Sequence, residues 1–473
     1  MKKTRTTVLL ACLVFISLVF TACENVFMPQ ESNTISVENK EREQVEHLPE
    51  KQEYSGTDFV VAVIDEKKAL FSTDEVGESI IKSAVEQRNK LVTDKYGIVL
   101  EIKYVRANDV LTKMKAAQAA GTQYADLLCF PGDTLVSLAD NNLLFNLISS
   151  EDFKITAKYI DTNNAKSVAV NNSLYMLYES ATQYYDDAWV VFYDKGLISE
   201  ANLTDPAALV ANGQWTWGKF AEYAETVSYK VMNKGSPDLK TDIFGYSSYN
   251  NDTELPLIMW ESCGTPMFGN TYLKKVSLDV SLTKLNDSVA FFKEIYTSKS
   301  RYPLDKSNAL DAFSDGRLAF LMYKLEYAAA LESSDREWGL LPLPKYNEEQ
   351  KSYYSFVDAK AYALAIPSNV SDPQKSVILL NAFCAASGEA VKEAVKTKYV
   401  NLFFQNNTST VMLGTIIDTV YLDMAALYGS KMEKVSQISI DIVVNAITKN
   451  APINKTITDL TPGFDKFSEE KFT

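Results

Sequence analysis

The sequence predicts an α/β fold divided into two lobes. The chain has 473 residues, which is more than a single hydrophobic core usually serves. Apolar runs of strand length alternate along it with segments whose apolar residues recur at helical spacing. This alternation is typical of a largely parallel sheet with helices on its faces, and it continues towards the C-terminus.

The alternation begins with strand 59–64, an apolar run rich in β-branched residues that we expect to be buried on both faces. Helix 80–92, strand 99–105, helix 108–117 and strand 126–130 follow, with a further helix start at 131–134. Ligands of such sheets bind beyond the carboxyl ends of the strands. The side chains expected there are Asp65, Glu66, Phe130 and Asp133.

The second part of the chain continues the same pattern. Expected strands are 189–193, 318–323 and 361–366, and expected helices are 220–227, 289–296 and 375–386. Trp215 and Trp217 precede the first of these helices and are assigned to the core.

The N-terminus has the features of a secretory signal peptide over residues 1–22. A basic head is followed by the apolar run 8–20, which is too short for a normal membrane span. Thr21-Ala22-Cys23 resembles the bacterial lipobox, in which Cys23 becomes lipidated, although Phe20 stands where Leu is usual. An uncleaved anchor is the alternative. The glutamate-rich residues 23–56 are expected to form a disordered tether to the outer face of the cell membrane.

Composition excludes several classes of function. The net charge of −14 disfavours a nucleic-acid partner, and His47 is the one histidine, which disfavours histidine-based catalysis and multi-histidine metal sites. Cys129, Cys263 and Cys384 are scattered and form no CxxC motif. We therefore expect buried thiols, no disulfide framework, no metal and no cofactor.

Several segments, in order, resemble the extracellular solute-binding protein family 1, the maltose- and oligosaccharide-binding group. They are YADLL at 124–128, LADNNLL at 138–144, SLYML at 173–177, VFYDK at 191–195, WTW at 215–217, FSDGRLAF at 313–320, WGLLPLP at 338–344 and AYALAIP at 361–367. The sixth corresponds to the family's F-x-x-G-x-x-A-M stretch.

The resemblance implies a periplasmic-binding-protein-like fold of type II, in which two hinged lobes hold a solute between them. Lobe 1 would comprise 57–187 and 361–425, and lobe 2 would comprise 188–360 and 426–473. It also implies a monomer that delivers a carbohydrate to the permease subunits of an ABC importer and performs no catalysis.

Sugar recognition combines carboxylates or amides with aromatic faces. By resemblance, Asp133 and Phe130 occupy positions of a cleft carboxylate and a cleft aromatic residue. A helix cap is the alternative for Asp133, and the core is the alternative for Phe130. Asp187, six residues before Tyr193, matches a ligand-contacting carboxylate, and Tyr184 lies in the same loop. Turn chemistry is the alternative for both.

The second lobe offers Asn251 and Asp252 in a polar loop, followed by Trp260 as a ring-stacking candidate, for which core burial is the alternative. Glu326, with Tyr323 nearby, stands where the family usually has a stacking aromatic residue. Asp358 precedes the second presumed crossing and is a further candidate.

Two other functions compete with solute capture. A secreted glycosidase would use two carboxylates, for example Asp187 and Glu261, on either side of a glycosidic bond. A sensor lipoprotein would present its bound solute to a membrane receptor.

Overall fold

The structure is a computed structural model, and it describes residues 48–50, 53–72, 79–233, 235–248, 254–269, 272, 275–278, 282–302, 308–332, 334–402 and 407–472. The signal peptide predicted at 1–22, Cys23 and most of the predicted tether lie outside these residues. The tether prediction extends too far at its C-terminal end. Leu48 is buried, the Tyr96 hydroxyl donates to the Pro49 carbonyl oxygen at 2.8 Å, and the Tyr54 N–H donates to Tyr96. Residues 48–50 and 53–56 therefore belong to the folded body.

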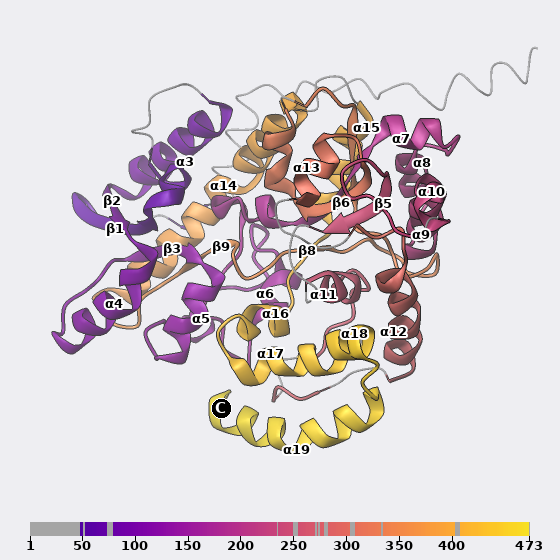
Figure 1. The fold of residues 1–473 in the computed structure, drawn as a ribbon. Helices are drawn as coiled ribbons and strands as arrows, with labels where there is room; N and C mark the ends of the chain where they lie inside the picture. Colours follow the sequence, from indigo (N-terminus) through magenta and orange to yellow (C-terminus); the bar gives the residue numbers. More distant parts are fainter. Residues whose placement is uncertain are drawn as a thin grey trace, which may run out of the picture. The chain divides into compact units, whose positions relative to one another are not determined.

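The first sheet has the strand order β2-β1-β3-β9 (Figure 1). Its strands are β1 (Thr57–Ile64), β2 (Ile98–Val105), β3 (Leu127–Pro131) and β9 (Tyr362–Ala365). β1 pairs in parallel with both β2 and β3, whereas β9 runs antiparallel to β3. Because β1 is an inner strand, its apolar run is buried on both faces, as the sequence predicts.

Helices α3 (Ile80–Tyr96), α4 (Val110–Ala119), α5 (Gly132–Asp140) and α14 (Pro373–Leu402) accompany this sheet. The Ser79 side chain caps α3 by accepting from the Lys82 N–H, and α3 ends at Gly97, whose φ of 67° suits glycine. α14 packs along α3.

The second sheet has the order β5-β6-β4-β7. Its strands are β4 (Trp189–Asp194), β5 (Phe244–Ser248), β6 (Leu318–Lys324) and β7 (Trp338–Pro342). β4 is antiparallel to both β6 and β7, and β5 is parallel to β6. α9 (Trp217–Val227) packs on β5 and β6: the Phe220 ring contacts Tyr246 of β5 and Phe320 of β6, and Trp215 contacts both phenylalanine rings. Trp215 and Trp217 lie in the core, as predicted.

Three backbone segments that connect the parts carrying the two sheets are bonded to one another; we call them the crossing segments. Ala188, just before β4, forms a bridge with Val357. β8 (Ser355–Phe356), between β7 and β9, pairs in parallel with β10 (Val420–Tyr421). The Val357 N–H also donates to the Tyr421 carbonyl oxygen at 2.9 Å.

The contacts of two helices differ from the lobe ranges that the resemblance implies. α15 (Asn407–Asp418) falls within 361–425 but packs on β7 and on α8 (Pro206–Ala211) of the second sheet. α16 (Met424–Gly429), most of which was assigned to lobe 2, packs on α5 and α6 (Thr162–Val168) of the first. The chain therefore rejoins the first sheet at β9, where expected, but leaves it at α15, before the predicted boundary at 425, and contacts its helices again through α16.

The remaining described helices are α7 (Lys195–Glu200), α10 (Tyr229–Met232), α11 (Glu254–Glu261), α12 (Leu282–Thr297), α13 (Asn308–Ser314), α17 (Glu433–Ser439), α18 (Asn445–Lys449) and α19 (Ile453–Lys471). Short helical turns include η1 (Asp65–Leu70), η4 (Ser180–Thr182), η5 (Tyr184–Asp187), η6 (Leu325–Leu331) and the π-helical η7 (Ile440–Val444). Among the described helices, none combines the length and the apolar character that spanning a membrane requires. Cys129, Cys263 and Cys384 are buried free thiols, as predicted.

Candidate functional site

A buried lysine joins two of the crossing segments. The Lys324 Nζ, at the end of β6, lies 2.8 Å from the Asp187 Oδ1 and 2.9 Å from the Asp358 Oδ2. The pairing of Trp189 with Lys324 in the β4–β6 ladder brings these residues together. Burial alone would lower the pKa of Lys324, but the two carboxylates outweigh burial and raise it. Asp187 and Asp358 are thus brought into one charged cluster.

A second ion pair lies at the start of α5. The Gly132 and Asp133 N–H groups donate to the carbonyl oxygens of Ala361 and Ala359, which brings Asp133 close to the crossing segment. The Asp133 Oδ2 lies 2.5 Å from the Lys360 Nζ and 3.5 Å from the Lys431 Nζ. Burial raises the pKa of Asp133, but the hydrogen bond and charge of Lys360, with Lys431, lower it overall. The capping alternative is wrong, because Pro131 is the N-cap residue and no side chain caps the helix.

The crossing segments form one wall of a cavity of about 320 Å³, which we call the crossing cavity. Trp189 and the stretch from Phe356 to Lys360 line this wall. α11 contributes one face, with lining residues at helical spacing from Glu254 to Glu261. α16 and α17 complete the lining, and Ser436 and Ser439 present hydroxyl groups. The cavity therefore combines an indole ring, carboxylates, an ammonium group and hydroxyls.

Glu261 is the chemically unusual residue of this lining. Its side chain sits at the end of α11 and the residue is only 4% exposed. Within the described part of the chain, its Oε2 has no hydrogen-bond partner. Burial, and to a smaller extent the charge of Asp423, raise the pKa of Glu261 well above its ordinary range. Because buried acceptors without a partner are rare in folded proteins, Glu261 is a candidate for contact with a bound solute.

The structure separates the residues predicted for the site. Asp358 lines the crossing cavity. Asp133 pairs with Lys360, which also lines the cavity, and Asp187 pairs with Lys324, the lysine that Asp358 also contacts. Glu66, Asp187 and Tyr362 line a different cavity of about 190 Å³, so Asp187 and Glu261 do not face a common space. The glycosidase hypothesis requires that they do.

The other predicted residues do not reach the crossing cavity. Phe130 is fully buried in β3, Trp260 is 1% exposed, and Tyr184 is buried against Tyr178 and Tyr185. For Phe130 and Trp260 this is the core position given as the alternative.

Three predicted residues lie nearer the surface. Asp65 is exposed in η1, Glu326 pairs with Lys67 at 3.6 Å, and Tyr323 packs its ring against Trp189 and Tyr327. Asn251 and Asp252 lie outside the described residues.

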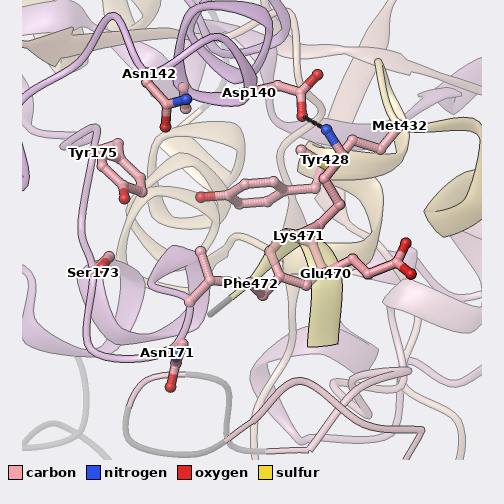
Figure 2. Close-up of a pocket in the computed structure, with 12 residues that line it drawn as sticks. Asp140, Asn142, Asn171, Ser173, Tyr175, Tyr428, Met432, Glu470, Lys471 and Phe472 are labelled. Atoms are coloured by element: carbon pink, nitrogen blue, oxygen red, sulfur yellow. Dashed lines mark hydrogen bonds and ion pairs between the residues drawn. The ribbon is translucent and has the colours of Figure 1, made fainter. Parts of the chain in front are cut away.

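Another cavity, of about 260 Å³, lies on a different face of α16 (Figure 2). Tyr428 and Met432 line it, whereas Ala425 and Gly429 line the crossing cavity. Figure 2 shows the Tyr428 hydroxyl directed towards Tyr175, with an ion pair of 2.7 Å between Lys471 and Asp140 at the edge. None of the crossing segments contributes to it, so the crossing cavity is the better candidate site.

Sequence reasoning missed several lining residues. Ser436 and Ser439 are three positions apart on one helical turn, a spacing that marks a common face but not what the face meets. Lys360 follows the predicted Asp358 by two residues, and Trp189 was predicted only as the start of a strand. Within the described residues, no group of three or more His, Cys, Asp or Glu side chains is arranged to hold a metal ion.

Comparison with known proteins gives one family match. The model of a family described as bacterial extracellular solute-binding protein matches residues 86–403. No curated protein sequence matches the chain.

Solved structures share the fold at low sequence identity. The maltose-binding periplasmic protein MalE of Listeria monocytogenes, in complex with maltose, is 14% identical with a TM-score of 0.56, covering 88% of this chain and 99% of that chain. The galacto-N-biose-/lacto-N-biose I-binding protein of an ABC transporter from Bifidobacterium longum is 12% identical with a TM-score of 0.56, covering 89% and 98%. The GacH receptor of Streptomyces glaucescens is 12% identical with a TM-score of 0.52, covering 87% and 99%. These similarities confirm the predicted two-lobed α/β fold.

Proposed function

The chain belongs to the bacterial extracellular solute-binding protein family, and from that premise we propose that it captures a carbohydrate in the crossing cavity and delivers it to an ABC importer. The observation that carries the proposal is the cavity itself, because its lining comes from two crossing segments and from helices α11, α16 and α17. A solute held there touches parts of the chain that pack on both sheets.

The chemistry of the lining supports a polyhydroxylated solute. Asp358 and Lys360 offer an acceptor and a donor two residues apart, and Ser436 and Ser439 offer hydroxyls. The Trp189 ring supplies an apolar face of the kind that covers the C–H side of a sugar. The volume of about 320 Å³ is at the small end of ligand pockets, which favours a mono- or disaccharide. The structural neighbours include proteins solved with maltose and with lacto-N-biose.

Capture would work by shifting a conformational equilibrium. A ligand that contacts both lobes only when they are shut stabilises the shut state by its differential affinity. We assign the first sheet to lobe 1 and the second to lobe 2, with Ala188, Val357 and Tyr421 at the hinge. No bond is made or broken in this cycle, so the solute leaves unchanged.

The N-terminus gives the proposed location. Cleavage before Cys23 and acylation of its thiol would leave a lipid-anchored monomer on the outer face of the cell membrane, tethered by residues that end before Leu48. From there the protein would present its solute to the permease subunits. Metabolic labelling with a palmitate analogue tests the anchor, since Cys23→Ser is expected to abolish the label.

A thermal-shift screen of the mature domain tests the function. Maltose, lacto-N-biose and their monosaccharides are added at millimolar concentrations. A ligand at 100 times its Kd is expected to add about 2.7 kcal/mol, which corresponds to a rise in Tm of about 3 °C for a domain of this length. The shift must saturate with concentration, because excluded sugars stabilise any protein weakly and without saturation. If no carbohydrate gives a saturating shift, the assignment of a carbohydrate solute fails.

A further inference from the structure

Glu261 lines the crossing cavity, and its buried Oε2 has no hydrogen-bond partner among the described residues. Two other charged residues of the lining form ion pairs: Asp358 with Lys324 at 2.9 Å, and Lys360 with Asp133 at 2.5 Å. Glu254, two helical turns earlier on the same face of α11, has interactions of its own. Glu261 thus differs from its neighbours, because none of the described lysines or arginines forms an ion pair with it.

The charge that acts on the pKa of Glu261 comes from another carboxyl group. The charged residue that acts on it is Asp423, the N-cap of α16, which accepts from the Ala426 N–H at 3.1 Å and from the Tyr421 hydroxyl at 3.3 Å. Burial raises the pKa of Cys263, two residues along the chain; Lys284, which donates to the Cys263 carbonyl oxygen at 3.2 Å, opposes this shift and Glu261 adds to it. The pKa of Tyr421 on β10 is raised by burial first, then by Asp423 and Glu261. The charge that acts on Glu261 itself is therefore that of another carboxyl group.

An ionised carboxylate in such surroundings is costly unless a cation joins it. A sugar hydroxyl offers only a dipole, whereas an ammonium group offers a full charge and three N–H donors. In a poorly solvated cavity, an ammonium–carboxylate pair is stabilised much more strongly than a hydrogen bond from a neutral hydroxyl. We infer that the solute carries a protonated amine that pairs with Glu261, and that it is an amino sugar. This inference rests on the proposed capture of a carbohydrate and specifies its class.

Pairing changes the protonation of the site. In the empty cavity Glu261 holds its proton, because burial disfavours the ionised form. When the ammonium group binds, the carboxyl O–H bond breaks, the carboxylate stays paired with the ammonium, and one proton passes to solvent. Binding is therefore expected to release about one proton and to strengthen as pH rises, up to the pKa of the amine itself.

Isothermal titration with matched sugars tests the inference. The probes are the mono- and disaccharides of D-glucosamine, their N-acetyl counterparts, which lack the charge, and spermidine, which is an amine without a sugar. We expect the amines of the sugar series to bind about 100-fold more tightly than the N-acetyl forms. Because the buffer takes up the released proton, the binding heats measured in phosphate and in Tris should differ. The expected difference is that between the ionisation enthalpies of the two buffers, for about one proton per ligand bound.

Glu261→Gln keeps the shape and removes the charge. In this variant the glucosamine sugars should lose their advantage over the N-acetyl forms, whose affinity should be unchanged. The control Glu433→Gln makes the same change at an exposed position of α17. It should change neither the affinity for the glucosamine sugars nor that for the N-acetyl forms. The melting curve of Glu261→Gln shows that it is folded, since removing an unpaired buried acid should not lower its Tm.

The outcomes separate this inference from the function on which it rests. If neutral sugars bind as tightly as the amines, or if Glu261→Gln leaves the advantage of the amines unchanged, capture of a carbohydrate stands and the amine inference is overturned. If spermidine binds through Glu261 and no sugar does, amine recognition stands and the carbohydrate assignment fails. If none of the probes binds, the amine inference is overturned, and carbohydrate capture is overturned with it when the thermal-shift screen also gives no saturating shift.

Discussion

Replacing Lys324 by methionine is expected to lower the free energy of unfolding by about 3–5 kcal/mol at pH 7, the cost of leaving buried charges unpaired. Lys324 is the shared partner of Asp187 and Asp358, whose side chains are 10% and 25% exposed. Methionine fills a similar volume, so the loss comes mainly from the two carboxylates that remain together without a cation. Urea unfolding of the mature domain measures the change.

The pH dependence identifies the cause. Burial already raises the pKa of Asp187 against the opposing charge of Lys324. Without Lys324 this pKa should rise further, so the variant loses stability as pH rises from the unfolded-state value near 4. The deficit relative to wild type should therefore shrink towards pH 4. Lys90→Met breaks an exposed i,i+4 pair with Asp94 and should cost at most about 0.5 kcal/mol. A deficit equal to that control would mean that the buried triad contributes nothing to stability.

Replacing Glu179 by glutamine is expected to stabilise the protein at alkaline pH, on the order of 4 kcal/mol. Glu179 is buried just before η4, and its Oε1 accepts from the Asp161 N–H at 2.8 Å. Burial raises the pKa of Glu179 from 4.5 to about 8; the Asp161 N–H opposes this shift and the Asp161 charge adds to it. The folded protein therefore keeps a proton that the unfolded chain releases.

The sign follows from that difference. The contribution of Glu179 is fully present below pH 4.5 and is lost as pH rises from 4.5 towards about 8. Glutamine keeps the acceptor for Asp161 and does not titrate, so the variant and wild type should match at pH 4 and diverge up to pH 8. Glu86→Gln, at an exposed position of α3, should change stability by less than about 0.5 kcal/mol throughout. Parallel curves for wild type and Glu179→Gln across this range would refute the assignment.

Most of the fold could be predicted because hydrophobic pattern reports burial directly. β1 and β4 are continuous apolar runs, and both proved to be inner strands. β5 and β7 were not predicted as strands, since FGYSS is short and half polar and WGLLP contains glycine and ends in proline. They take their place by pairing with β6 and β4. Such pairing depends on tertiary neighbours, which propensity does not contain.

The site was less accessible to sequence reasoning. The rule that ligands bind beyond strand ends located Asp133 but could not distinguish it from Phe130, which lies three residues earlier and is fully buried. The partners that define the charged clusters are distant in sequence, with 227 positions between Asp133 and Lys360 and 137 between Asp187 and Lys324. Only the fold brings them together. Glu261 was considered as a catalytic acid, and its lack of a partner became visible only with its surroundings.

The central claim is that the crossing cavity holds a polar solute and releases it unaltered. Ala426→Trp places an indole ring in that cavity from α16, whereas Ala116→Trp places one on the exposed surface of α4. Titration of wild type with a sugar from the thermal-shift screen should give one site per chain with a Kd near the micromolar range, about −8 kcal/mol, and mass spectrometry should recover the sugar intact. The account predicts that Ala116→Trp binds like wild type and that Ala426→Trp, although folded, does not bind. Equal binding by both variants, or recovery of a converted sugar, would contradict it.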